Sequence, residues 1–350
     1  MSAALAKDAL LSQSASTAAS QGASLTKDES LAQGTLSAQD ASTAAAQGTL
    51  SAQDASLAQG APSAAAQGGE GPSSEEIAAF QREVREQGKL HWRDLPWRNI
   101  DDDYAVLVSE VMLQQTQVQR VLGYWQRFMA LFPTLDALAA ADTRIVLENW
   151  QGLGYNRRAL MLKRCAEECA ARYQGKLPRD RAELLALPGI GPATAGGILA
   201  FARNEPCIYL ETNVRCVFLR HFFSDEDKVP DRLIEPLVAQ ACPEGDVRGW
   251  YYALLDYGAH LKATGENHSR RARVYTRQSV FEGSRRQKRA AILRFVLGGE
   301  GVSLPEIVAA LEEFEAAAQR PAPDPALVQE IVDELVAEGF FRCEDGLFRA

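Results

Sequence analysis

The sequence predicts an all-α fold preceded by a low-complexity tail. From about residue 75, apolar residues recur at helical spacing, and up to residue 285 no segment shows the alternation of a half-buried strand. Residues 1–74 are mainly Ala, Ser, Gln and Gly, and the stretch AQGTLSAQDAS occurs twice, at 32–42 and 46–56. Such a segment buries too little apolar surface to offset its ordering entropy, so we expect it to be disordered.

The expected helices are joined by short connections. The sequence SSEE places Ser73 and Ser74 as candidate caps of a helix that runs to about Lys89, and Asp103 can cap the next helix. One apolar face then follows over residues 118–129. Further helices fit residues 134–140, 142–150, 156–173, 180–187, 192–203, 212–222, 231–242 and 246–263.

A smaller unit is predicted for residues 286–350. Its sequence GFFRCEDGLFRA indicates a hairpin that turns at Asp345-Gly346. Three helices before the hairpin, fitting residues 286–297, 303–318 and 324–338, make the unit winged-helix-like. The last helix carries five acids and no Lys or Arg, which argues against docking in a DNA major groove. We expect this helix to pack against the main domain or to bind a partner.

Composition and charge exclude several classes of protein. The chain contains no run of 18 apolar residues and no basic-plus-apolar leader, so we expect neither a membrane span nor secretion. Its six scattered cysteines suit reduced thiols in a cytoplasm, and its four histidines form no metal-ligand spacing. The net charge is −9, yet residues 270–294 carry nine Lys or Arg and one acid. A local basic strip matters more for nucleic-acid binding than the total charge.

The segment LPGIGPATAGGI at 187–198 joins two expected helices. Gly189 and Gly191 permit a tight turn and the close approach of another backbone. Pro192 suits the first turn of a helix, and the exposed N–H groups there can bind a phosphate without a basic side chain. The segment therefore predicts a helix–hairpin–helix motif, which would let an acidic protein bind DNA. A simple corner between two helices is the alternative.

Two acids are candidates for catalysis. Glu110 lies in the apolar stretch AVLVSEVMLQQT, where partial desolvation should raise its pKa and let it donate a proton. A buried Glu paired with an Arg is the alternative. Glu211 follows Gly189 by 22 residues, which leaves room for one helix and a short connection, so it should begin the next helix. Capping alone would explain Glu211, although capping does not exclude chemistry.

Four segments in this order, SEVMLQQTQV, WQGLGYNRRA, LPGIGPATAGGI and ETNVRCV, resemble the helix–hairpin–helix (HhH-GPD) DNA glycosylases, and among them the MutY-like adenine glycosylase branch. The resemblance covers about Leu95 to Leu261. It implies a helical fold of two subdomains within residues 75–285, which acts as a monomer in base excision repair. It further implies double-stranded DNA as the partner, a base flipped out of the duplex, and a nucleoid-associated cytoplasmic location.

The resemblance also assigns roles to single residues. Glu110 would protonate the departing adenine, Glu211 would stabilise an oxocarbenium-like sugar, and Asn213 would support the catalytic acid. The residues expected to contact DNA are Gln114, Gln115 and Tyr155, which would enter the base stack, and Gly189, Gly191, Ala193 and Thr194 of the hairpin. Ala193 stands where bifunctional relatives carry a catalytic lysine, which implies a monofunctional hydrolase with no amine placed for a Schiff base. Carbonyl oxygens within 187–191 would hold a monovalent cation.

Two departures from the family pattern concern the substrate. An aspartate is usual where this chain has Glu211, and the extra methylene moves the carboxylate by about 1 Å, which can cost around a hundredfold in rate. The branch usually ends in a domain that recognises 8-oxoguanine, and residues 286–350 are too short and too helical for it. The motif GLGYN also lacks the second tyrosine common in the branch.

A third departure concerns the cofactor. The family usually binds a [4Fe–4S] cluster through four cysteines after the last barrel helix, but residues 256–285 contain no cysteine. We therefore expect no cluster and no other metal centre. The basic loop 262–285 is expected to take over the phosphate contacts, through Arg270, Arg271 and Arg273. A plain solvated basic face is the alternative.

The leading interpretation is a monofunctional DNA glycosylase that removes adenine opposite G or 8-oxoguanine. A thymine or uracil mismatch glycosylase is the second, and it predicts base release that survives Glu110→Gln. A non-catalytic DNA-damage-binding module is the third, and it predicts lesion binding without base release.

Overall fold

Helices dominate the computed structural model, which describes residues 71–350 and confirms the all-α class. The predicted tail over 1–74 lies almost wholly outside these described residues. Ser73 caps the first described helix, α2 (Ser74–Leu90), through a reciprocal capping box with Glu76, as predicted. Among the described helices, none is long and apolar enough to cross a membrane.

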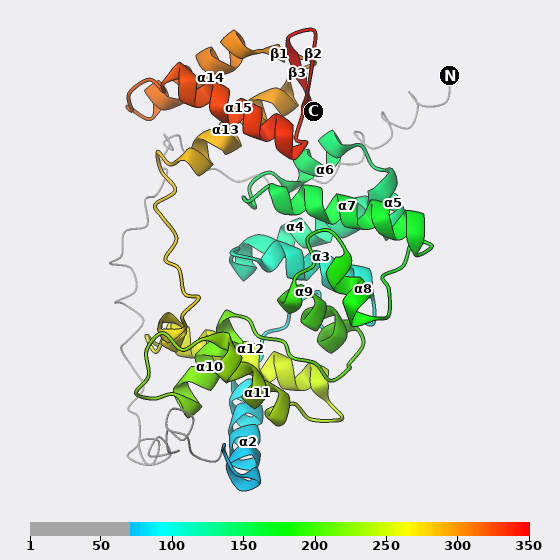
Figure 1. Cartoon of the computed structure of the whole chain (residues 1–350), viewed down its shortest axis with the longest axis vertical. Coiled ribbons are helices and arrows are strands. Elements are labelled where there is room, and N and C mark those ends of the chain that lie inside the picture. The colour runs from blue at the N-terminus through cyan, green and yellow to red at the C-terminus, as the bar shows by residue number, and fades with distance from the viewer. Residues whose placement is uncertain (1–70) are drawn as a thin grey trace, which may run out of the picture. The chain divides into compact units, whose positions relative to one another are not determined.

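One group of helices joins segments that lie far apart in the sequence. Its members are α2, α10 (Thr212–Phe222), α11 (Asp231–Ala241) and α12 (Val247–Ala263). Figure 1 shows α2, in blue, beside the green and yellow α10–α12. The ring of Phe80 on α2 packs edge-on against Phe218, Phe222 and Trp250, at centroid separations of 5.0, 4.9 and 5.9 Å. Such aromatic burial fastens α2 to α10 and α12.

The second group is formed by the helices between residues 103 and 202. Its members are α3 (Asp103–Leu113), α4 (Val118–Leu131), α5 (Leu135–Ala140), α6 (Thr143–Trp150), α7 (Arg157–Arg172), α8 (Arg181–Ala186), α9 (Pro192–Gly197) and the π-helix η1 (Ile198–Ala202). Helix α3 contacts α4, α7, α9 and η1, and nearly all its residues are buried. Because η1 also contacts α12, the two groups meet along the contact between η1 and α12.

Two expectations about these helices were wrong in detail. Asp102, not Asp103, caps α3, and it accepts the N–H groups of Tyr104 and Ala105 at 2.9 and 3.1 Å. The cap must be extended, as Asp102 is, whereas Asp103 is already helical and pairs with Arg203 at 2.7 Å. The helix expected over 192–203 also changes at Ile198 from an α-helix to the wider π-helix η1.

The C-terminal unit has the element order of a winged helix. It contains α13 (Arg285–Gly298), β1 (Val302–Ser303), α14 (Leu304–Ala317), α15 (Pro325–Glu338), β2 (Arg342–Glu344) and β3 (Leu347–Arg349). The strands form an antiparallel sheet in the order β1-β3-β2. The hairpin turns at Asp345 and Gly346, as predicted, with φ of 52° and 76°, as a two-residue turn of this kind requires. The sequence did not indicate β1, which is only two residues long.

The acidic side of α15 is neutralised within the same unit. Arg289 of α13 pairs with Glu334 at 2.7 Å and with Glu338 at 2.9 Å, and Arg285 also pairs with Glu334 at 2.7 Å. Arg164 of α7 donates to the carbonyl oxygen of Glu338 at 2.9 Å. Helix α15 therefore packs mainly within its own unit, against α13 and α14, rather than against the main domain, and Arg164 links its C-terminal end to the second helical group.

Candidate active site

A pocket of about 630 Å³ opens where the two helical groups meet. Helix α3 contributes Glu110, η1 contributes Phe201, and α12 contributes Ala259 and Lys262. The predicted site residues that line this pocket are Glu110, Gln114, Gln115, Ala193, Thr194, Glu211 and Asn213. Residues from three of the four matched segments thus line one pocket, whereas Tyr155 of the fourth segment does not.

Close helix packing holds Glu110 in place. A Cβ atom at residue 197 would lie 2.4 Å from Oε2 of Glu110, so α9 can approach the carboxyl this closely only because residue 197 is glycine. The π-helix begins at the next residue, and such local widening of a helix is frequent at functional sites. Tyr209, which is buried, forms a side-chain hydrogen bond with Glu110.

The surroundings of Glu110 favour its protonated form. Burial raises the pKa of Glu110 from its ordinary value of 4.5 to about 8; the hydrogen bond to Tyr209 opposes this rise in part, and the negative charge of Glu211 adds to it. The Glu110 side chain is half-buried, because one side of it faces the pocket. At neutral pH, the pocket therefore contains a carboxylic acid that can donate a proton.

Glu211 begins α10, as predicted. Its Oε1 accepts the N–H groups of Asn213 and Val214 at 2.6 and 3.1 Å. The positive end of the helix favours negative charge at this position. Arg215, one turn further on, pairs with Asp231 at 2.6 Å. A Cβ atom at Gly258 would lie 2.3 Å from the carbonyl oxygen of Asn213, so glycine there lets α12 press against the start of α10.

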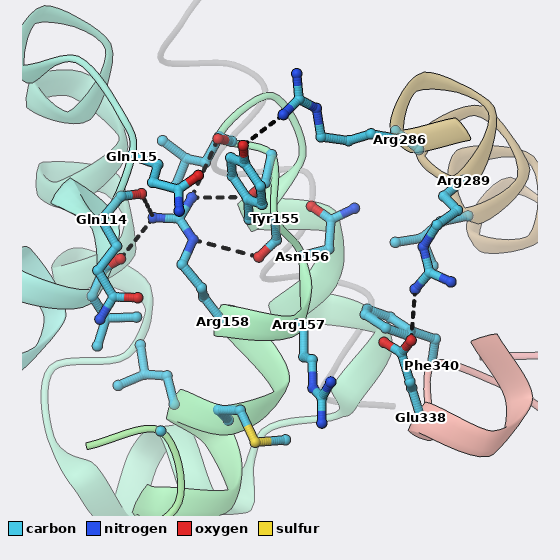
Figure 2. A pocket seen from close by; sticks show the side chains of 18 of the residues that line it. Gln114, Gln115, Tyr155, Asn156, Arg157, Arg158, Arg286, Arg289, Glu338 and Phe340 are labelled. Carbon is cyan, nitrogen blue, oxygen red and sulfur yellow. Dashed lines mark hydrogen bonds and ion pairs between the residues drawn. The ribbon is translucent and has the colours of Figure 1, made fainter. Parts of the chain in front are cut away.

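A second pocket, of about 1240 Å³, lies beside the first (Figure 2). Gln114 and Gln115 line both pockets, whereas Tyr155 and Gly189 line only the larger one. The C-terminal unit contributes Arg286 and other residues of α13 to its lining. Of the residues expected to enter DNA, Gln114 and Gln115 therefore separate the two pockets and Tyr155 borders the larger one; these three residues form the rim between the pockets.

Arg158 joins the two segments that carry Gln115 and Tyr155. Its Nη1 donates to the carbonyl oxygen of Gln114 at 2.6 Å, and its Nη2 donates to that of Gly154 at 2.9 Å. Burial lowers the pKa of Arg158 from 12.5 to about 10, which still leaves the guanidinium charged at neutral pH. The role of Arg158 could not be read from its local sequence, because its partners on α3 lie over 40 residues away.

Glycine has a different structural role at each of the two hairpin positions. Gly189 has φ of 76°, and a Cβ atom there would lie 2.7 Å from Cβ of Met161, so the turn requires glycine. A Cβ atom at Gly191 would meet no atom within 4 Å, so that side of the turn is open to another molecule. Gln114 Nε2 donates to Thr194 Oγ1 at 3.2 Å and ties the hairpin to the end of α3.

The three arginines predicted in the basic loop are not part of either pocket. Arg270 and Arg273 are exposed. Arg271 instead donates to carbonyl oxygens at the end of α10, at 2.6 Å for both Leu219 and Ser224, and also to Phe223. These bonds satisfy helix carbonyls that lack partners within the helix, so Arg271 anchors the loop to α10.

Sequence reasoning also missed the walls of the active-site pocket. The guanidinium of Arg98 binds Asp256 at 2.7 and 2.8 Å and contacts the rings of Trp92 and Tyr252, 4.7 and 4.5 Å from their centroids. No local spacing relates residues so far apart. Lys262 was considered only as the position of an absent cysteine, yet this residue lines the pocket.

Comparison with known proteins agrees with this geometry. Residues 108–241 match the HhH-GPD superfamily of base excision DNA repair proteins. The chain is 34% identical to the adenine DNA glycosylase of Buchnera aphidicola subsp. Baizongia pistaciae over 168 residues, which are 48% of each chain. It is 40% identical to that of Mycolicibacterium smegmatis over 169 residues, 48% of this chain and 58% of the relative.

The HhH-GPD region thus resembles the adenine glycosylase branch, as predicted. The match spans about half the length of these curated relatives. Among solved structures, a thermostable thymine-DNA glycosylase aligns with a TM-score of 0.49 at 22% identity, covering 53% of this chain and 87% of its own.

Replacing Glu110 with Gln should change how stability depends on pH. Between pH 4.5 and about 8, folded Glu110 keeps a proton that the unfolded chain has lost. The free energy of unfolding of the wild type should therefore fall as pH rises through this range, by up to about 1.4 kcal/mol per pH unit. Urea unfolding between pH 5 and 9 should show that Glu110→Gln lacks this component. The control is the exposed Glu86→Gln, and matching pH profiles of wild type and Glu110→Gln would contradict the raised pKa.

Proposed function

We propose that this chain is a monofunctional DNA glycosylase that hydrolyses the N-glycosidic bond of a flipped adenine opposite G or 8-oxoguanine. The observation that carries the proposal is the pairing, in one pocket, of the protonated Glu110 with Glu211 at a helix N-terminus. The adenine glycosylase relatives support the choice of base. The pocket, at about 630 Å³, has room for an extrahelical nucleotide.

Glu110 would act as the general acid. A purine leaves more readily when one of its ring nitrogens is protonated. The protonated base takes up the electrons of the glycosidic bond and departs as a neutral molecule. A carboxyl with a pKa of about 8 is largely protonated at neutral pH and can transfer that proton within the closed pocket. The nearby phenol of Tyr209 has its pKa raised well above the usual value, mainly by burial, so it can serve as a hydrogen-bond donor but not as a competing base.

Glu211 would face the sugar. Departure of the base leaves positive charge on the sugar ring, and a carboxylate beside it lowers the barrier, as in sugar hydrolases. The two backbone N–H groups hold Oε1 of Glu211, and the described residues form no hydrogen bond to its Oε2. The longer Glu side chain can therefore cap α10 with one oxygen and present the other to the pocket. Water would then attack the sugar and leave an abasic site.

Double-stranded DNA would bind across the rim between the two pockets. Gln114, Gln115 and Tyr155 line it, and the open side of Gly191 allows a phosphate to approach the backbone N–H groups of the hairpin. The carbonyl oxygens of Pro188, Gly189 and Ile190 accept no hydrogen bond from any described residue. They fit a monovalent cation, which would add positive charge near that phosphate.

The residues present do not fit an iron–sulfur cluster. Residues 256–285 contain no cysteine, and in the described chain no three metal-ligating side chains gather. We propose that the anchoring of Arg271 to α10 replaces the cluster in holding this loop, and that the exposed Arg270 and Arg273 contact phosphates.

Single-turnover base release on four duplexes should identify the substrate. The duplexes contain A:8-oxoguanine, A:G, T:G and U:G pairs. The proposal predicts release of adenine by the wild type, slowed about a hundredfold to ten-thousandfold by Glu110→Gln and by Glu211→Gln. Glu86→Gln is the matched control and should equal the wild type. Release of thymine or uracil that survives Glu110→Gln would assign the pyrimidine activity, and binding without release would assign a damage-binding module.

The same reactions should be run with borohydride, because Lys262 lines the pocket. A monofunctional hydrolase forms no Schiff base, so no covalent protein–DNA complex should be trapped. A complex that disappears in Lys262→Gln would contradict the monofunctional assignment.

The salt dependence of DNA affinity should separate the three loop arginines. Arg270→Ala combined with Arg273→Ala should make the slope of log affinity against log salt shallower by about 0.9 for each phosphate that the variant no longer neutralises. Arg271→Ala should instead lower the free energy of unfolding, by about 2 kcal/mol, because it removes charged hydrogen bonds to helix carbonyls. Arg82→Ala on α2 is the exposed control. An unchanged slope in the double variant would contradict the phosphate contacts.

A further inference from the structure

The segment 278–286, which links α12 to the C-terminal unit, holds two of the proposed DNA-entering side chains. Gln278 Nε2 donates to Oε1 of Gln115 at 3.1 Å. Arg286 Nη1 donates to the hydroxyl of Tyr155 at 2.6 Å, and its guanidinium lies 5.2 Å from the centre of the Tyr155 ring. Figure 2 shows Arg286 reaching from α13 to Tyr155.

Gln115 and Tyr155 share an uncommon backbone conformation. Their φ angles are 54° and 46°, in the left-handed region that costs free energy for residues other than glycine. Arg158 fixes the backbone beside both residues, because it donates hydrogen bonds to the carbonyl oxygens of Gln114 and Gly154, the residues that precede them. Both backbones are thus fixed by one arginine, while both side-chain ends are fixed by the segment 278–286.

Arg286 differs from the neighbouring arginines of α13 in what it binds. Arg285 and Arg289 are paired with the acids of α15 and belong to the internal structure of the C-terminal unit. Arg286 bonds to Tyr155 and to the carbonyl oxygen of Ser279, and its guanidinium lies 5.3 Å from the ring of Phe281. It forms no ion pair with any described acid, so no described carboxylate neutralises its positive charge beside Tyr155.

We infer that Gln278 and Arg286 are positioning residues, which preset Gln115 and Tyr155 for insertion into the duplex. The inference rests on the proposed function, since it concerns the step in which the target base leaves the stack. A long side chain loses rotational freedom when it inserts between bases, and a side chain that is already ordered loses less. The C-terminal unit would thereby take part in opening the DNA, although its acidic helix α15 is unsuited to reading it.

The effect should depend on whether the target base is paired. Base opening costs least when the base has no partner. Single-turnover release of adenine should therefore be about tenfold slower in Arg286→Ala and in Gln278→Ala when adenine faces 8-oxoguanine. The same variants should be close to wild type when adenine faces an abasic site. A defect that only weakened the fold would slow both duplexes equally.

Three further variants sharpen this test. Arg286→Lys keeps a donor for the Tyr155 hydroxyl and should recover most of the rate. Arg82→Ala removes an exposed arginine of α2 that lines neither pocket and should equal the wild type. Combining Arg286→Ala with Tyr155→Phe should be no slower than the slower single variant, because both remove the same hydrogen bond.

The outcomes distinguish failure of the proposed function from failure of the positioning role alone. A wild type that releases no adenine from either duplex would overturn the proposed function and the positioning role with it. An active wild type whose Arg286→Ala and Gln278→Ala variants are equally active, or slowed alike on both duplexes, would overturn only the positioning role. Faster release by these variants would also overturn it and show that the segment obstructs DNA.

Discussion

The packing of Glu110 against the backbone at Gly197 is the contact on which the active-site pocket depends. It requires glycine at 197 and brings α3, α9 and η1 together at the pocket floor. The same contact removes water from one side of the carboxyl and thereby raises its pKa. Fold and chemistry are therefore coupled, because the helices that bury the acid are also those that present the hairpin.

The two acids of the pocket have opposite surroundings. Glu110 is enclosed by apolar helix and retains its proton, whereas Glu211 receives two backbone N–H groups at the start of α10. Such a difference between neighbouring carboxyls supports the proposed roles, proton donation for Glu110 and stabilisation of positive charge for Glu211. The C-terminal unit contributes a third element to the proposed site, because Arg286 bonds to Tyr155 on the rim where the duplex would bind.

Features governed by neighbours in the sequence could be predicted, and those governed by distant contacts could not. The Ser73 cap, the Glu211 helix start and the Asp345-Gly346 turn each follow from a few adjacent residues. The π-helix after Gly197 packs against α3, a contact between distant segments that no local pattern records. The partners of Arg158 and Arg286 lie 44 and 131 residues away, and Arg271 was expected at phosphates but serves α10.

The pH dependence of base release tests the central claim, that Glu110 is the proton donor, most directly. The measurement is the single-turnover rate of adenine release by the wild type from pH 5 to 10. If the protonated carboxyl is required, the rate should stay level to about pH 8 and then fall about tenfold for each further pH unit. A rate that already falls above pH 5, or that stays level to pH 10, would contradict the account.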